Sequence, residues 1–259
     1  MEPQLEIFRL TKHFGGLAAV HDLQFQVLQG EILGLIGPNG AGKSTVFNLI
    51  NGFLPVTRGR ITYEGRDITG LKAHRIARLG IGRAFQASTL FMKLSVFENV
   101  FNGFHLRYQK AAWRSFLHTR AAREEEERAR EEAMEILRFM GLARLQGVLA
   151  QNLPHGHQKM LGVCIAMAIR PKLLLLDEPL AGMHPEETAA MSEVIRKVRD
   201  SGVTIVLVEH NIAAVMRLCD RIVVLNQGRK IAEGLPAEIA QNQEVIEAYL
   251  GADDEEGVG

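Results

Sequence analysis

Cysteine is scarce in this sequence, and there is no excess of charge of either sign. The 259 residues include two cysteines, Cys164 and Cys219, which lie far apart and share no C-x-x-C spacing. This argues against a disulfide framework and favours reduced core residues of a cytosolic protein. Lysine plus arginine total 30, and aspartate plus glutamate also total 30. Because no net field would attract DNA, RNA or anionic lipid, we expect no nucleic-acid partner.

Long hydrophobic runs are missing as well. The longest apolar stretches, residues 173–176 and 203–208, are far shorter than the roughly 18 residues that a membrane-spanning helix needs. Residues 1–10 lack the charged segment followed by an apolar segment that marks a secretory signal. Hydrophobic residues make up 47% and charged residues 23% of the chain, which is ordinary for a globular protein. We therefore expect a soluble cytoplasmic protein.

A glycine-rich run between an apolar strand-like segment (31–36) and an apolar helix face (46–50) matches the pattern G-x-x-x-x-G-K-[ST]. Glycines in such a loop let backbone N–H groups converge on phosphate oxygens, and the following helix directs its positive end toward them. The lysine would reach the β- and γ-phosphates, and the serine hydroxyl would bind Mg²⁺. The run predicts a nucleoside-triphosphate site formed by Gly37, Pro38, Asn39, Gly40, Ala41, Gly42, Lys43, Ser44 and Thr45.

Two carboxylates follow the four consecutive leucines of residues 173–176, a pattern typical of a strand buried on both faces. Ligands bind at the carboxyl ends of strands in open α/β sheets. Downstream of a phosphate loop, Asp177 therefore becomes a candidate Mg²⁺ ligand, and Glu178 a candidate base for the attacking water. His210 follows the apolar segment 203–208 and could contact the γ-phosphate. A histidine after a strand is more often a cap or surface residue, but its position relative to Asp177 favours the site.

Strand-like and helical segments alternate along the chain, which favours a parallel sheet with both faces covered. The run of Ala, Arg and Glu at 120–135 predicts a solvated helix with i,i+4 ion pairs from Glu124 to Arg128 and from Glu126 to Arg130; a binding role for this charge run is the alternative. We expect strands at 5–8, 23–27, 60–63, 80–85, 173–176, 203–208 and 222–225, and helices at 73–79, 111–140, 154–169, 185–201 and 212–218.

Several motifs occur in one order: the phosphate loop, Arg83-Ala84-Phe85-Gln86, Leu176-Asp177-Glu178-Pro179, the loop 181–185 and His210. In that order they resemble the ATPase subunits of ABC transporters over residues 5–251. Phe85-Gln86, the segment 94–100, Glu209-His210-Asn211 and the ending 245–251 are similar to the subgroup that serves branched-chain amino acid importers, or related importers of urea and short amides.

The resemblance implies an α/β fold with a P-loop NTPase core, a mostly parallel sheet, an N-terminal antiparallel β subdomain and an inserted helical subdomain. It implies a single ABC ATPase domain at 1–251, in which 1–95 and 153–251 form the nucleotide-binding core and about 96–152 form the helical subdomain. Residues 252–259 are acidic and contain glycine, and we expect a disordered tail there.

The resemblance also assigns roles to residues. Phe14 matches the aromatic residue that stacks on adenine, with a core phenylalanine as the alternative. Gln86 matches the glutamine that contacts Mg²⁺ and the attacking water, Glu178 the catalytic base and His210 the γ-phosphate switch. Residues 181–185 match the loop that crosses to the opposing subunit, although His184 stands where the family has Asp or Asn.

The signature motif departs from the family pattern. Residues 153–159 read Leu-Pro-His-Gly-His-Gln-Lys where Leu-Ser-Gly-Gly-Gln is usual. Pro154 removes a hydroxyl and an N–H, but the helix N-terminus keeps its dipole and other amides. Gly156 and His157 are therefore expected to face the partner's ATP, and His155 or His157 could supply donors. A metal role for the two histidines lacks an adjacent carboxylate or thiol partner. We expect ATP hydrolysis that is reduced but not abolished.

The favoured function is a peripheral subunit at the cytoplasmic face of the membrane that hydrolyses ATP, with Mg²⁺, to power an importer. Its expected partners are transmembrane permease subunits, a second ATPase subunit in a homo- or heterodimer and, indirectly, a periplasmic or extracellular solute-binding protein. Alternatives are an export ATPase of the lipopolysaccharide type, a soluble ABC ATPase and a simple P-loop switch or kinase. The absence of net charge opposes the soluble ribosome- or DNA-binding type.

Overall fold

The computed structural model describes residues 2–84, 90–104 and 120–256. Its centre is a sheet in which neighbouring strands run parallel, except that the edge strand β10 is antiparallel to β9. The strands in spatial order are β10 (Arg229–Gly234), β9 (Arg221–Asn226), β3 (Ile32–Ile36), β8 (Thr204–Val208), β7 (Leu173–Asp177) and β6 (Ile81–Ala84). The predicted fold class, an α/β core around a mostly parallel sheet, is confirmed.

The four leucines of β7 contribute to two different hydrophobic cores. Leu174 and Leu176 belong to one hydrophobic core, and Leu173 and Leu175 belong to another. Because successive side chains of a strand point to opposite faces, a strand covered on both sides needs apolar residues at every position. The sheet therefore separates two cores.

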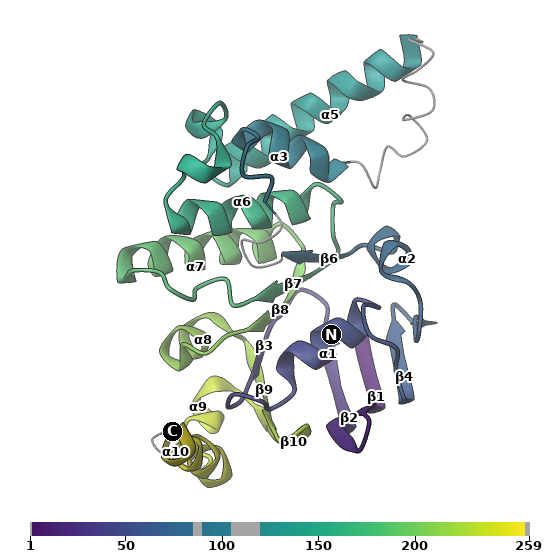
Figure 1. The fold of residues 1–259 in the computed structure, drawn as a ribbon, viewed down its shortest axis with the longest axis vertical. Helices are drawn as coiled ribbons and strands as arrows, with labels where there is room; N and C mark the ends of the chain where they lie inside the picture. The colour runs from purple at the N-terminus through teal and green to yellow at the C-terminus, as the bar shows by residue number, and fades with distance from the viewer. Residues whose placement is uncertain (1, 85–89, 105–119, 257–259) are drawn as a thin grey trace.

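An antiparallel sheet and helix α1 (Lys43–Ile50) cover one face of the central sheet. The antiparallel order is β2 (Leu17–Leu28), β1 (Pro3–Phe14), β4 (Arg58–Tyr63) and β5 (Arg66–Asp67). Figure 1 shows α1 beside β1 and β2. The first two strands form a hairpin closed at Gly15, whose φ is 57°. They are longer than the predicted segments 5–8 and 23–27 because cross-strand pairing extends regular structure into polar positions.

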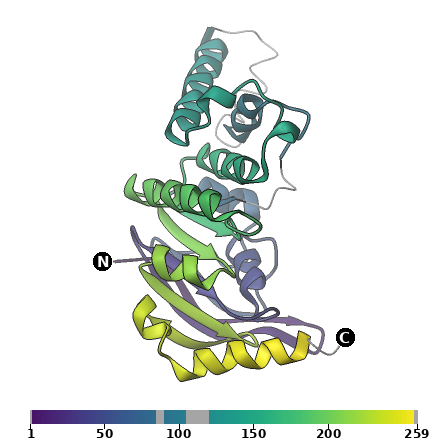
Figure 2. The same cartoon turned by 90° about the vertical axis from the view of Figure 1, so that its left-hand side faces the viewer.

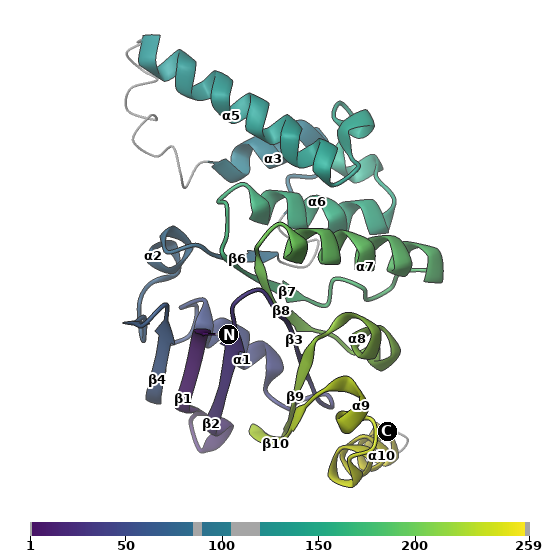
Figure 3. The same ribbon diagram turned by 180° about the vertical axis from the view of Figure 1, so that it is seen from behind.

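Helices stack on the other face, in the order α7, α6, α3 and α5 away from the sheet (Figure 1, and from behind in Figure 3). Alanines 129 and 133 and Leu137 of α5 are buried in the core that also contains α6, while Glu126 and Arg130 pair on its exposed side at 2.8 Å. The helix that the prediction assigned to the nucleotide-binding core, α6, lies between α3 and α7. The helices are α3 (Val96–Gly103), α5 (Arg120–Phe139), α6 (His155–Met167), α7 (Pro185–Asp200) and α8 (Ile212–Leu218).

The C-terminal region forms elements that the pattern analysis did not place: β10, α9 (Pro236–Ile239) and α10 (Gln243–Glu256). Figure 2 shows α10 along the end of the molecule opposite α5. The expectation of a disordered tail from residue 252 is wrong for residues 252–256, which continue α10. No proline interrupts this segment, and its alanine and glutamates favour a helix. The shorter α2 spans Ala73–Arg78.

Among the described residues, no helix combines the length and the apolar character that crossing a bilayer requires.

Candidate functional site

The phosphate loop joins the buried strand β3 to α1, as the motif predicts. Gly37 has a φ of 151°, and a Cβ at this position would overlap the carbonyl oxygen of Leu225. Gly42 has a φ of 100°, and its Cβ would lie 2.6 Å from the carbonyl oxygen of Ala19. Both positions therefore require glycine, for backbone conformation and for close packing. The loop is held against the neighbouring chain segments in a conformation that other residues would not adopt.

Lys43 lies inside this loop. Its side-chain Nζ donates to the carbonyl oxygens of Gly37 at 2.7 Å and Pro38 at 2.9 Å. Burial lowers the pKa of Lys43, and the charges of Glu178 and Asp177 oppose that shift. The same three groups therefore share one electrostatic environment, so the structure brings the loop and the two carboxylates together.

Asp177 ends β7 and forms an ion pair with Arg83 of β6, with 2.5 Å between Oδ2 and Nη2. Arg83 also donates to Asn48 of α1 at 2.7 Å, which ties this edge of the sheet to the phosphate-loop helix. The sequence pattern indicates no role for Arg83, because its partners come from distant segments.

Mg²⁺ fits the donors at this edge of the sheet. Proteins that bind nucleotide hold it through one or two side-chain oxygens together with substrate phosphates. Ser44 is exposed at the start of α1, and the Asp177 carboxylate has a second oxygen, Oδ1, beside the one bonded to Arg83. A hydroxyl and one carboxylate match that donor set.

Glu178 and His210 meet although 32 residues separate them in sequence. Nε2 of His210 lies 3.1 Å from Oε1 of Glu178, and both side chains are partly exposed. Because an ionised carboxylate only accepts hydrogen bonds, Nε2 carries the proton when Glu178 is ionised. Glu178 has a φ of 49°, and its N–H donates to the carbonyl oxygen of Val208 at 2.9 Å. Strand β8 thus holds the glutamate in an uncommon backbone conformation.

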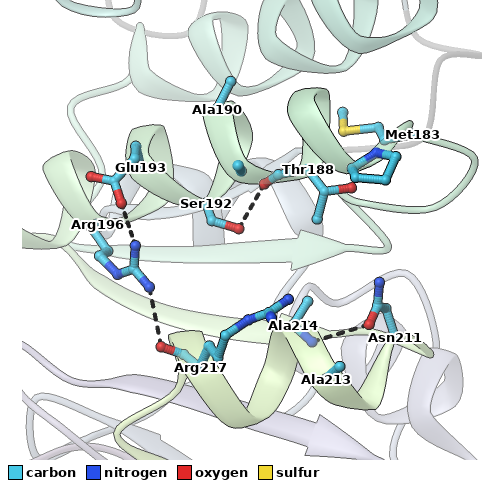
Figure 4. A pocket seen from close by; sticks show the side chains of 12 residues that line it. Met183, Thr188, Ala190, Ser192, Glu193, Arg196, Asn211, Ala213, Ala214 and Arg217 are labelled. Carbon is cyan, nitrogen blue, oxygen red and sulfur yellow. Dashed lines mark hydrogen bonds and ion pairs between the residues drawn. The ribbon is translucent and has the colours of Figure 1, made fainter.

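The loop after Glu178 leads into α7. His184 is the N-cap residue, and its N–H donates to Oε2 of Glu187 at 3.1 Å. Pro185 follows at the first helical position, where its missing N–H costs little. Met183 and Pro185 are among the residues that line a groove between α7 and α8. Figure 4 shows Met183 and Asn211 at the same end of this groove.

The altered signature segment begins α6. Pro154 is the N-cap residue and has no side-chain cap bond. A Cβ at Gly156 would lie 2.8 Å from Oε1 of Glu187, so the start of α6 packs closely on the start of α7. His157 is partly buried on the first turn of α6. In the described part of the chain, no group of three or more His, Cys, Asp or Glu side chains is arranged for a metal ion, His155 and His157 included.

The structure describes one of the two remaining predicted residues. Phe14 ends β1 with 47% of its surface exposed, and Nζ of Lys12 lies 4.9 Å from its ring centre. The alternative that it is a core residue is therefore wrong. Gln86 lies outside the described residues.

Lys159 and Glu209 belong to the same region and were missed as functional candidates. Lys159 of α6 donates to carbonyl oxygens in the loop after β7, and Glu209 accepts from the backbone N–H groups of Leu180 and His210. A lysine in a helix and a glutamate after a strand carry no local signal of such contacts. The apolar segment before Glu209 was the nearest clue, since it places the glutamate at the carboxyl end of a buried strand.

Comparison with known proteins agrees with this geometry. Residues 20–181 match the ABC transporter family model, and residues 229–255 match the model described as branched-chain amino acid ATP-binding cassette transporter. The high-affinity branched-chain amino acid transport ATP-binding protein LivG of Salmonella typhimurium is 41% identical over 251 residues, covering 96% of this chain and 98% of LivG.

Other relatives show how far the similarity extends. BraF of Pseudomonas aeruginosa, which has the same description as LivG, is 40% identical and covers 96% of this chain and 98% of BraF. The lipopolysaccharide export system ATP-binding protein LptB of Escherichia coli is 34% identical, covering 94% and 95%. The ADP conformation of a crystallised ATP-binding cassette from an ABC transporter superposes with a TM-score of 0.86 at 29% identity, covering 97% of this chain and 100% of that one.

The similarity spans the phosphate loop, the Asp177-Glu178 strand end and the C-terminal helices. The predicted resemblance, including the branched-chain subgroup, is confirmed, and so is the predicted ATPase class. This chain belongs to the ATP-binding subunits of ABC transporters.

Proposed function

We propose that this ATPase powers the import of branched-chain amino acids or related small polar solutes. The names of LivG and BraF, at about 40% identity over nearly the whole chain, support this substrate class over lipopolysaccharide export. The observation that carries the proposal is the matching C-terminal region, since residues 229–255 follow the branched-chain transporter model through β10, α9 and α10.

Uptake by the reconstituted transporter tests the substrate class. We expect proteoliposomes that contain this subunit, its permeases and the solute-binding protein to accumulate labelled leucine when ATP is enclosed on the cytoplasmic side. Uptake is compared with that of liposomes that lack the transporter, and with uptake of labelled urea in place of leucine. ATP-dependent release of lipopolysaccharide from the membrane, without leucine uptake, would instead support the export alternative.

The geometry supports a direct hydrolysis mechanism. The oxygen of a water molecule attacks the γ-phosphorus, the bond from that phosphorus to the β–γ bridging oxygen breaks, and ADP and phosphate leave. Glu178 accepts a proton from the water, and His210 orients the glutamate and contacts the γ-phosphate. Lys43 stabilises negative charge on the β- and γ-phosphates. Mg²⁺, held by Ser44, Asp177 and Gln86, would supply further charge neutralisation there.

A second ATPase subunit completes the site in this proposal. The first turn of α6, with Gly156 and His157, presents helix N-terminal amides to the γ-phosphate bound by the partner. The loop 181–185 crosses the interface, and Phe14 stacks on adenine. Because Pro154 lacks a hydroxyl and an N–H, a heterodimer in which the partner supplies a more usual signature is favoured.

Replacing Pro154 tests whether the altered signature segment limits ATP hydrolysis. We expect Pro154→Ser to raise ATP turnover severalfold, because serine restores a donor where removal of one transition-state donor typically costs about 10²-fold or more. Steady-state phosphate release from the assembled transporter measures the change. The matched control is Pro236→Ser at the start of α9, which should leave turnover unchanged. An unaltered rate for Pro154→Ser would mean that the hydroxyl does not limit hydrolysis.

The transmembrane permease is proposed to dock in a groove of about 440 Å³ between α2, β6, α3 and α6. The groove is predominantly apolar and is lined by residues that include Phe53, which is 54% exposed. Exposed apolar surface bordered by polar side chains, here His74 and Asn102, is typical of protein–protein contacts. Ile81, Gly82 and Arg83 of β6 line the groove, and Gln86 follows β6 in the sequence. Docking there would place the chain at the cytoplasmic face of the membrane.

A charge in the groove should weaken this contact. We expect Phe53→Asp to reduce permease association about tenfold or more, since truncating an aromatic residue central to an interface has effects of that size. Co-purification of the detergent-solubilised complex measures association, and ATP binding by the free subunit should stay unchanged. Phe8→Asp is the control, because Phe8 of β1 is 55% exposed but lies outside the groove. Equal losses for both variants would contradict docking in the groove.

A further inference from the structure

A buried glutamate, Glu209, contacts the backbone next to the Glu178–His210 pair. Glu209 is 1% exposed; its Oε1 accepts the N–H of Leu180, and its Oε2 accepts the N–H of His210 at 3.2 Å. Burial raises the pKa of Glu209, while the backbone N–H groups and the charge of Lys159 oppose that rise. One carboxylate thus joins the loop after Glu178 to the backbone of the switch histidine.

Lys159 binds the same loop through its carbonyl groups. Its Nζ donates to the carbonyl oxygen of Glu178 at 2.7 Å and to that of Ala181 at 2.6 Å. Burial lowers the pKa of Lys159, and the charges of Glu209 and Glu178 oppose that shift. The lysine lies in the second turn of α6. Its hydrogen bonds therefore connect the helix that begins with the altered signature to the loop after Glu178 of the same chain.

The first turn of α6 also packs against α7. Gly156 lies close to the side chain of Glu187, so a larger residue there would displace that carboxylate. The loop after Glu178 is therefore bonded to Lys159 of α6 through two carbonyl oxygens and to Glu209 through the N–H of Leu180. A displacement of α6 would act on this loop through those bonds, because close-packed interiors transmit strain.

We propose that Lys159 and Glu209 are positioning residues that make the placement of Glu178 and His210 depend on the signature helix of the same chain. The inference rests on the proposed role of Glu178 as general base. When α6 closes over the partner's ATP, Lys159 moves the carbonyl groups of Glu178 and Ala181 with the helix. Glu209, which binds the N–H groups of Leu180 and His210, moves the backbone of His210 together with this loop. Each subunit's hydrolytic geometry is thereby linked to the nucleotide bound by the other subunit.

The backbone of Glu178 shows why such support is needed. Its φ of 49° is uncommon for a residue with a side chain, and such a conformation persists only where surrounding contacts hold it. The N–H bond to Val208 and the bond from Lys159 hold the peptide groups on both sides of Glu178. Removing the lysine leaves two carbonyl groups to relax, and a displacement of about 1 Å at a catalytic group can cost about 10²-fold in rate.

Lys159→Met tests the proposal in the assembled transporter, because methionine keeps the length of the chain without its charge. We expect kcat for ATP hydrolysis to fall about 10- to 100-fold, while ATP affinity stays within about twofold. Lys159→Arg should recover most of the rate, since a guanidinium can donate to both carbonyl groups. Lys197→Met, an exposed lysine on α7, is the matched control and should have no effect.

Glu209→Gln provides a second route to the same result if Lys159→Met fails to fold. It should also lower kcat with little change in ATP affinity, and the double variant should lose no more than about the larger single effect if the two residues act as a unit. A kcat near the unmodified value for both single variants would overturn the proposal. A parallel loss of kcat and ATP affinity, or a failure of Lys159→Arg to recover the rate, would also overturn it.

Glu178→Gln measured alongside separates this inference from the proposed base. Normal turnover in Glu178→Gln would remove the general-base role, and the inference with it. A large loss in Glu178→Gln together with normal turnover in Lys159→Met and Glu209→Gln would leave the base in place and overturn the positioning role alone.

Discussion

Glu178→Gln is expected to slow ATP hydrolysis steeply while leaving ATP binding intact. The amide keeps the size of the side chain and can still accept from His210, but it cannot take a proton from the attacking water. Loss of a general base lowers rates by about 10²- to 10⁴-fold. Because the γ-phosphate then stays in place between the subunits, the ATP-bound dimer should also become long-lived.

Single-turnover phosphate release and nucleotide-dependent size-exclusion chromatography measure the two effects. Glu186→Gln is the matched control, since Glu186 is exposed in the first turn of α7 near the same loop. Near-normal turnover in Glu178→Gln, or an equal loss in both variants, would remove Glu178 from its proposed role.

Lys43→Met should produce the second large effect, this time on binding. The substitution removes the ammonium group that is held inside the phosphate loop and that lies near Glu178 and Asp177. A preorganised charge facing phosphate oxygens is worth about 10²- to 10³-fold. We therefore expect ATP affinity to fall by about that factor, with hydrolysis falling at least as much.

Equilibrium binding of a fluorescent ATP analogue and thermal unfolding distinguish binding from stability in this variant. Methionine leaves the carbonyl groups of Gly37 and Pro38 without their ammonium donor, so a modest loss of stability is compatible with the prediction. Lys197→Met again serves as the control. Unchanged ATP affinity in a folded Lys43→Met protein would contradict the assignment of the loop.

Elements with strong local patterns were predictable from the sequence. The apolar run of β7 and the helix at Ile212–Leu218 lie where the pattern placed them, because burial on both faces and helical periodicity leave direct marks on residue choice. The phosphate loop is equally local. His210 was predicted to lie near the site because it follows a buried strand, but its contact with Glu178 was not predicted; the parallel pairing of β7 with β8 brings those strand ends together.

Contacts between distant polar residues were not predictable in the same way. Arg83 meets Asp177 across 94 residues of sequence, and Lys159 reaches backbone carbonyl groups that any residue would supply. Neither contact has a characteristic spacing. The edge strand β10 was missed because its mostly polar residues carry little alternation, and its position depends on pairing with β9.

The alternation of the four β7 leucines between two cores has a consequence for divergence within the family. A substitution in the helical layer, which meets Leu174 and Leu176, changes packing on one side of the sheet only. The phosphate loop depends on the side that holds Leu173 and Leu175. The outer helices α3 and α5 can therefore vary without changing the packing around the phosphate loop, whereas α6 has less freedom because its Lys159 bonds to the loop after Glu178.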